Sequence, residues 1–107
     1  MPPRARILVV DDEPNARDAL RTLLTDEGFA VSEAGDGVEA LAALRDQGAD
    51  VVLADVRMPR MDGLQLVRSA REEGLPAAFV MMTAFASVET AVEAMRAGAE
   101  NFLTKPL

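Results

Sequence analysis

The amino-acid sequence predicts an α/β fold in which a parallel five-stranded sheet carries helices on both faces. Short apolar runs, typical of buried strands, alternate with longer segments whose apolar residues recur every three or four positions, as in amphipathic helices. This alternation is strict along the chain, which favours a parallel sheet built through right-handed crossovers. The 107 residues, half of them hydrophobic, are enough for one domain with its own core.

The five predicted strands cover residues 6–10, 29–34, 51–55, 77–82 and 101–104. The first and third are continuous apolar runs, which is typical of strands buried on both faces. Residues 29–34 form a shorter and more mixed run, which indicates an edge strand. After the third strand, Pro59 prevents further pairing because proline has no amide donor for a ladder.

Four helices are predicted between the strands, and each has a start signal and a stop signal. The start signals are Pro14, which fits a first helical turn, and the capping residues Asp36, Asp62 and Ser87. The stop signals are Gly28, Gly48, the run 74–76 after a third helix over residues 64–73, and Gly98. The positions expected to face the sheet are Ala16, Leu20, Leu23, Leu24, Val38, Leu41, Ala42, Leu44, Val88, Ala91, Val92 and Met95.

Composition excludes several classes of function. The net charge is −7, so the domain offers no basic stripe for nucleic acid. The absence of cysteine excludes disulfide and thiol chemistry, and the absence of histidine removes the commonest general base. No apolar run approaches the roughly 20 residues of a membrane span, and the N-terminus lacks the apolar core of a signal peptide. We therefore expect a soluble cytoplasmic protein in which this domain itself binds neither nucleic acid nor membrane.

Chemically active side chains follow four of the five predicted strands. They are Asp11 and Asp12 after the first, Asp55 at the end of the third, Thr83 after the fourth and Lys105 after the fifth. Each alone is typical of a solvated loop, a turn or a helix cap. Because the carboxyl ends of parallel strands meet at one sheet edge, where ligands bind in open α/β sheets, together they indicate a shared site. Lys105 is also the only lysine, since the other ten basic residues are arginine.

Such a site needs a cation and suits a phosphoryl group. Two carboxylates about 4 Å apart repel each other by roughly 4 kcal/mol at an effective dielectric constant near 20. An all-oxygen ligand set selects a hard ion, and Mg²⁺ is the expected one. Magnesium with a lysine and a hydroxyl group is an arrangement that binds phosphoryl groups. A carboxylate left over can act as the nucleophile and needs no general base, because it is already ionised at pH 7.

Four motifs make the chain resemble the receiver domain of two-component response regulators. They are residues 7–14 (ILVVDDEP), 55–63 (DVRMPRMDG), 82–84 (MTA) and 97–106 (AGAENFLTKP). Together they span essentially the whole chain, so residues 1–107 are predicted to be one receiver domain. Residues 82–85 and 92–99 look most like receivers of the nitrogen-regulation type, which resemble NtrC.

The resemblance implies a flavodoxin-like doubly wound sheet with strand order 2-1-3-4-5 and a defined phosphorylation site. Asp55 would accept a phosphoryl group from a sensor histidine kinase. Asp12, Asp55 and the backbone carbonyl of Arg57 would bind Mg²⁺ directly, and Asp11 would help largely through water. Thr83 and Lys105 would bind the phosphoryl oxygens.

The resemblance also implies a conformational switch. Thr83 would move toward the phosphoryl oxygens, and Phe102, at the family's switch position, would turn inward. Lys105 and Pro106 lie where the family has a cis peptide bond, and Arg57 and Phe85 lie where it varies residues that set the lifetime of the acyl phosphate. The changed surface of the fourth helix and fifth strand would control an output domain, an ATPase or a DNA-binding module, and so transcription. The protein would be a switch rather than an enzyme, catalysing only its own phosphorylation and dephosphorylation.

The chain departs from the family at its C-terminal end. Family members carry a fifth helix after the Lys-Pro pair, whereas here only Leu107 follows Pro106. We therefore expect a receiver domain that is truncated after the fifth strand and lacks the last helix. The apolar surface left uncovered would favour association, and a homodimer is one expected outcome.

Two other functions fit the same fold class. A flavodoxin-like cofactor-binding module would need aromatic residues beside the flavin and a hydroxyl-rich first loop, but the chain has no Trp or Tyr and its first loop is acidic. A Mg²⁺-dependent phosphatase with an aspartyl nucleophile would need two spaced aspartates in the first loop, whereas Asp11 and Asp12 are adjacent.

Overall fold

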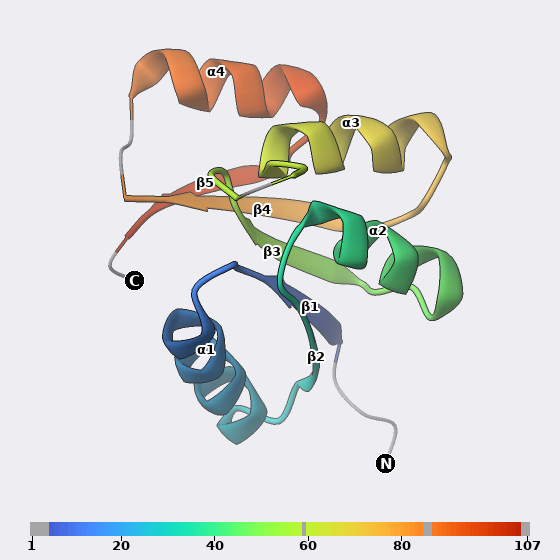
Figure 1. Ribbon diagram of the computed structural model, residues 1–107, viewed down its shortest axis with the longest axis vertical. Coiled ribbons are helices and arrows are strands. Elements are labelled where there is room, and N and C mark those ends of the chain that lie inside the picture. The colour runs from blue at the N-terminus through green and yellow to red at the C-terminus, as the bar shows by residue number, and fades with distance from the viewer. Residues whose placement is uncertain (1–4, 59, 85–86, 106–107) are drawn as a thin grey trace.

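The computed structural model describes residues 5–58, 60–84 and 87–105 (Figure 1). These residues form five strands: β1 (Arg6–Val10), β2 (Ala30–Ala34), β3 (Val51–Asp55), β4 (Ala78–Thr83) and β5 (Asn101–Thr104). They also form four helices: α1 (Pro14–Asp26), α2 (Gly37–Asp46), α3 (Gly63–Glu72) and α4 (Val88–Ala97). The predicted α/β class and the strict alternation of strands and helices are confirmed. Within the described residues, no helix follows β5 and none is long and apolar enough to cross a membrane.

The five strands form one parallel sheet in the order β2-β1-β3-β4-β5, as the resemblance implied. β2 is an edge strand, as its mixed composition predicted. The register places Asp55 of β3 beside Met82 of β4, and Thr83 of β4 beside Thr104 of β5. The carboxyl ends of β1, β3, β4 and β5 therefore lie along one edge of the sheet, where the chemically active residues were expected.

The caps predicted for three helices are confirmed. The side chains of Asp36, Asp62 and Ser87 accept hydrogen bonds from the backbone N–H groups of Glu39, Gln65 and Thr90, which start α2, α3 and α4. Asp62 and Gln65 form a full capping box, since the Gln65 side chain accepts from the Asp62 N–H in return. Gly98 ends α4 with a φ of 114°, a left-handed conformation that favours glycine.

The helices divide unequally between the two faces of the sheet. Helices α2, α3 and α4 cover one face, and α1 covers the other beside β1 and β2 (Figure 1). The larger core cluster lies under α2–α4 and includes the fully buried residues Leu66, Val67 and Phe79. The smaller cluster, on the side of α1, consists of Ile7, Val9, Leu53 and Met82, with half-buried neighbours such as Leu20.

Several predicted inward-facing positions are wrong. In α1, Leu23 is exposed, and in α2 Val38 and Ala42 are exposed while Leu41 and Leu44 are buried as expected. The largest error is in α4. Of its predicted apolar stripe, Val88, Val92 and Met95 face solvent and Ala91 is only half-buried, while Ala94 is buried instead. A small residue toward the sheet lets the helix pack closely, and this leaves the larger side chains outside.

Candidate functional site

The candidate site is assembled at the carboxyl edge of the sheet from the last residues of β3 and β4 and from residues that directly follow β1 and β5. Asp55 is the last residue of β3 and Thr83 the last of β4, while Asp11 follows β1 and Lys105 follows β5 directly. The backbone ties these ends together, because Lys105 N–H donates to the Thr83 carbonyl at 2.8 Å and Val56 N–H donates to the Met82 carbonyl at 2.9 Å.

Lys105 holds two of the predicted acids together. Its Nζ donates to Asp11 Oδ2 at 2.8 Å and to Asp55 Oδ2 at 2.6 Å. Asp11 precedes Lys105 by 94 positions in the chain, and Asp55 precedes it by 50. Asp11 is 1% exposed, and the Asp55 side chain is 13% exposed. One ammonium therefore balances two carboxylates in a partly desolvated site, where an unpaired charge would be costly.

The pKa of Lys105 reflects this position. Burial of the ammonium acts to lower its pKa, but the hydrogen bonds and charges of Asp11 and Asp55 outweigh it and raise the pKa above the ordinary value. Lys105 is therefore a firmly charged donor at neutral pH.

The remaining oxygens of the two acids are also held in place. Asp11 Oδ1 accepts from the Glu13 N–H at 3.0 Å, and Asp55 Oδ1 accepts from the Arg57 N–H at 2.9 Å. Arg17 of α1 donates to the Asp11 carbonyl at 2.7 Å. Both carboxylates are therefore held in defined orientations by these hydrogen bonds.

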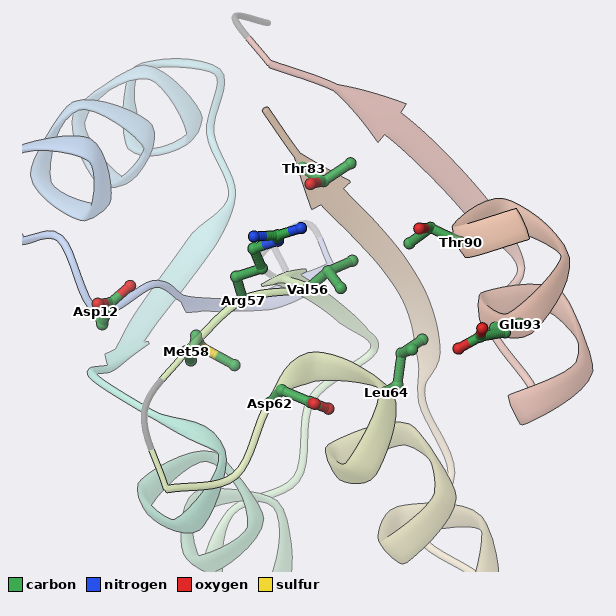
Figure 2. A pocket seen from close by; sticks show the side chains of 9 residues that line it. All are labelled: Asp12, Val56, Arg57, Met58, Asp62, Leu64, Thr83, Thr90 and Glu93. Atoms are coloured by element: carbon green, nitrogen blue, oxygen red, sulfur yellow. The ribbon is translucent and has the colours of Figure 1, made fainter. Parts of the chain in front are cut away.

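A polar cavity of about 600 Å³ opens beside these residues. Asp12, Arg57 and Thr83 line it from the loops at the strand ends, and Thr90 and Glu93 of α4 line the opposite wall (Figure 2). Asp12 is exposed whereas Thr83 is buried, so the cavity runs from solvent to the hydroxyl-bearing end of β4. A group entering it would meet acidic, hydroxyl and guanidinium side chains.

The donor chemistry of the site fits a hard divalent cation. Asp11 and Asp55 present carboxylate oxygens to one shared positive charge, and the neighbouring Asp12 and the Arg57 carbonyl are also oxygen donors. In the part of the chain that the structure describes, no three acidic side chains are grouped to hold a metal ion, and the Lys105 ammonium provides the positive charge.

The other predicted positions are Phe102, Pro106 and Phe85. Phe102 is half-buried in β5 and packs against the larger core cluster. Pro106, with its predicted cis peptide bond, and Phe85 lie outside the described residues.

Sequence reasoning missed two groups of residues at this edge. Thr90 and Glu93 line the cavity, although the sequence pattern marked α4 only by its apolar stripe. Asp36 and Arg60 join the loop before α2 to the loop before α3. Asp36 carried a usable signal, since it also follows a strand at the carboxyl edge, but nothing distinguished Arg60 from the other arginines.

Comparison with known proteins gives a consistent result. The sequence model of the response regulator receiver domain matches residues 7–107. The chain is 46% identical to the regulatory protein AtoC of Escherichia coli over 101 residues, which cover 94% of this chain and 22% of AtoC. The chain thus spans less than a quarter of that relative.

Solved structures agree with the sequence match. The receiver domain of Francisella response regulator 1452 superposes with a TM-score of 0.92 at 29% identity, covering 97% of this chain and 86% of that one. NtrX from Brucella abortus, solved in complex with ATP, superposes with a TM-score of 0.87 at 39% identity, covering 96% of this chain and 24% of NtrX. These similarities agree with the predicted resemblance to receivers of the nitrogen-regulation type.

Proposed function

Because the chain belongs to the response regulator receiver domain family, a family of signalling switches rather than conventional enzymes, we propose that it accepts a phosphoryl group on Asp55. The observation that carries this proposal is the Lys105 ammonium shared between Asp11 and Asp55 at the carboxyl edge of the sheet. Of the acids that Lys105 contacts, Asp55 has the more exposed side chain, at 13% against 1% for Asp11. Asp55 is thus the more accessible nucleophile.

The chemistry requires only the carboxylate and groups that stabilise phosphoryl oxygens. An Asp55 oxygen attacks phosphorus, the bond from phosphorus to the donor's leaving group breaks, and the leaving group departs with the bonding electrons. Lys105 and Thr83 would bind the phosphoryl oxygens, and the Lys105 ammonium would offset their negative charge. Bound Mg²⁺, held by Asp12, Asp55 and the Arg57 carbonyl with help from Asp11, would neutralise further negative charge.

The switch follows from the added charge. Phosphorylation replaces one negative charge with nearly two and adds strong acceptors next to Thr83. Thr83 moving toward them would leave space beneath α4, and Phe102, half-buried on β5, can fill it. A near-complete shift between two packings needs about 5.5 kcal/mol of differential stabilisation. Two or three charge-assisted hydrogen bonds at about 1.5–3 kcal/mol each supply much of it.

Family membership implies a histidine kinase as the phosphoryl donor, and relatives such as AtoC are several times longer than this chain. We propose that residues 1–107 form a receiver unit, working in the cytoplasm, whose α4–β5 surface controls a transcriptional output domain. The cofactor-binding and phosphatase alternatives have no support from the comparisons.

The test is phosphorylation by acetyl phosphate in the presence of Mg²⁺, followed by intact-mass spectrometry. The wild-type chain is expected to gain one acid-labile phosphoryl group, and Asp55→Asn is expected to gain none because the amide is not a nucleophile. Asp46→Asn, at the exposed end of α2, is the matched control and should be labelled like wild type. Undiminished labelling of Asp55→Asn would place the acceptor elsewhere.

A further inference from the structure

The loop between β3 and α3 contains an unusual backbone conformation at Arg60. Its φ is +67°, and among the described residues Arg60 is the one non-glycine residue with a positive φ. A residue with a long side chain adopts this left-handed conformation rarely, and it persists where the surrounding contacts fix it. The contacts of Arg60 therefore show what holds the loop.

Asp36 is the fixed partner of Arg60. Arg60 Nε donates to Asp36 Oδ2 at 3.0 Å, and Arg60 Nη2 donates to the same oxygen. The other Asp36 oxygen accepts from the Glu39 N–H at 2.9 Å and caps α2. The Asp36 side chain is only 9% exposed whereas that of Arg60 is 62% exposed, so α2 provides a rigid anchor and the arginine reaches to it.

A second contact joins the same two loops. The Gly37 N–H donates to the Met61 carbonyl at 3.2 Å, and a Cβ on Gly37 would lie 2.6 Å from that carbonyl oxygen. The Gly63 N–H closes the loop by donating to the Val56 carbonyl at 3.0 Å. The loop that begins at Val56 is thus closed by the Val56–Gly63 contact, and its residues Arg60 and Met61 are held to the start of α2.

This loop carries groups that the proposed function uses. The Arg57 N–H donates to Asp55, the Arg57 carbonyl is a proposed metal ligand, and Met58 and Asp62 line the cavity. We propose, on the basis of the proposed function, that Asp36 and Arg60 act as a positioning pair that fixes this loop for cation binding and phosphoryl transfer. Neither residue contacts the acceptor, so the pair acts through the loop.

Another ion pair on the same helix provides a comparison. Arg45 of α2 contacts Glu73, at the end of α3, through two hydrogen bonds of 2.7 and 2.6 Å. Like Asp36–Arg60, it links α2 to a neighbouring segment, but it lies beyond the C-terminal end of α3, away from the Val56–Asp62 loop. It is therefore a control for the general effect of losing an ion pair.

The experiment is a double-mutant cycle on the whole chain with Arg60→Gln, Asp36→Asn and both together, with Arg45→Gln as the control. Asparagine caps helices as well as aspartate. Glutamine at position 60 is polar like arginine but carries no charge. The measurements are the Mg²⁺ dissociation constant by calorimetry, the rate of labelling by acetyl phosphate, and amide hydrogen exchange of residues 57–62.

Each single substitution is expected to weaken Mg²⁺ binding and slow labelling by about 3- to 10-fold, and the double variant to be no worse than either single one. Exchange should accelerate in residues 57–62 while β1 and β3 stay protected, and Arg45→Gln should match wild type in all three measurements.

The positioning role would be contradicted if both single variants bound Mg²⁺ and were labelled like wild type. It would also be contradicted if the losses of the two single variants multiplied in the double variant. Exchange that accelerates as much in β1 and β3 as in residues 57–62 would also overturn it, because that result indicates general destabilisation alone. Absence of labelling in the wild-type chain would instead overturn the proposed function, and hydrogen exchange would still decide whether the pair holds the loop.

Discussion

At the scale of single residues, charge balance at the candidate site depends on Lys105. It is the only lysine in the sequence, and its ammonium balances Asp11, which is almost fully buried, and Asp55. Removing one partner from a buried charge pair destabilises a protein because the other charge stays behind without compensation. The site is therefore a determinant of stability as well as of chemistry.

Lys105→Met is expected to lower the free energy of unfolding by about 2 kcal/mol, since Asp11 and Asp55 would lose charged hydrogen bonds and repel each other. Urea unfolding followed by circular dichroism measures this, because the chain has no Trp or Tyr for fluorescence. Added Mg²⁺ should stabilise the variant more than the wild type. Equal unfolding midpoints for Lys105→Met and the exposed-site control Arg68→Met would contradict the prediction.

Asp36 makes stability depend on acid pH. The Glu39 N–H, and then the Arg60 side chain, lower the pKa of Asp36 below its ordinary value of 3.8. Ionised Asp36 therefore stabilises the fold above pH 3.8, and this contribution is lost as pH falls through the lower pKa of the folded state. Asp36→Asn should melt below wild type at pH 7, by an amount equivalent to about 0.5–1 kcal/mol. In thermal melts, the difference in melting temperature between wild type and Asp36→Asn should disappear only below pH 3.8. A difference that does not change with pH would contradict this prediction.

At the scale of elements, the sequence was a better guide to where helices begin than to which way they face. Asp36, Asp62 and Ser87 act as caps through contacts three residues away, so their role is encoded locally. In α4, two stripes share the same helical period: Val88, Val92 and Met95 on one side, and a row of small residues that includes Ala94 on the other. Periodicity identifies both stripes, and only packing against the sheet decides which one is buried.

Contacts between elements were harder still to predict. The convergence of Asp11, Asp55, Thr83 and Lys105 could be predicted because parallel strands end at one edge. The Asp36–Arg60 contact joins two loops 24 residues apart and depends on a left-handed residue that the sequence does not reveal. The strand order itself came from the family resemblance, not from the residue pattern.

The start of α3 allows no added side-chain atom. A Cβ on Gly63 would lie 2.5 Å from the Asp55 carbonyl oxygen and 2.4 Å from Met81 Cε. Gly63→Ala is therefore expected to cost about 2–3 kcal/mol of unfolding free energy and to slow labelling at Asp55, because the backbone must shift. Gly35→Ala is the comparison, since its Cβ would meet the end of a flexible side chain, the Glu39 carboxylate at 2.9 Å, and not backbone. Equal urea midpoints for the two variants would contradict the prediction.

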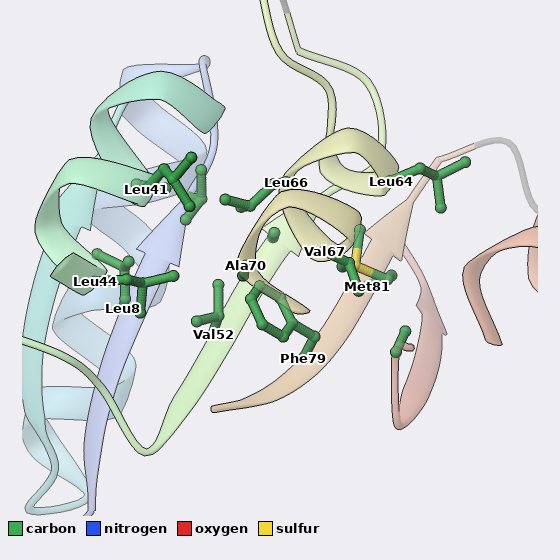
Figure 3. Packing of buried hydrophobic residues seen from close by; sticks show 14 of the residues in the cluster. Leu8, Leu41, Leu44, Val52, Leu64, Leu66, Val67, Ala70, Phe79 and Met81 are labelled. Atoms are coloured by element: carbon green, nitrogen blue, oxygen red, sulfur yellow. The ribbon is translucent and has the colours of Figure 1, made fainter. Parts of the chain in front are cut away.

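At the scale of the whole molecule, the sheet divides the core into two unequal parts. The larger part, between the sheet and helices α2–α4, contains Leu66, Phe79 and Met81, packed around the middle strands (Figure 3). The part beside α1 has a smaller buried cluster, and no residue of α1 is fully buried. Most of the stabilisation from apolar burial therefore comes from one side of the sheet.

Leu66→Ala should accordingly lower the free energy of unfolding by about 3–4 kcal/mol, because Leu66 is fully buried and its truncation leaves a cavity. Leu20→Ala, in the half-buried contact between α1 and the sheet, should cost less than half as much. Circular dichroism during urea unfolding measures both. A larger loss for Leu20→Ala would show that the α1 side dominates stability.

The 94-residue span between Lys105 and Asp11 has a consequence for biosynthesis. While the ribosome is adding residues 56–104, Asp11 and Asp55 have no Lys105 ammonium to balance them, since Lys105 follows strands β1–β5 in the chain. The contacts of Lys105 with Asp11 and Asp55 therefore cannot form before β5 and the residue that follows it have been made. If Asp55 is phosphorylated as proposed, the reaction would require a chain in which all five strands have been made and Lys105 is in place.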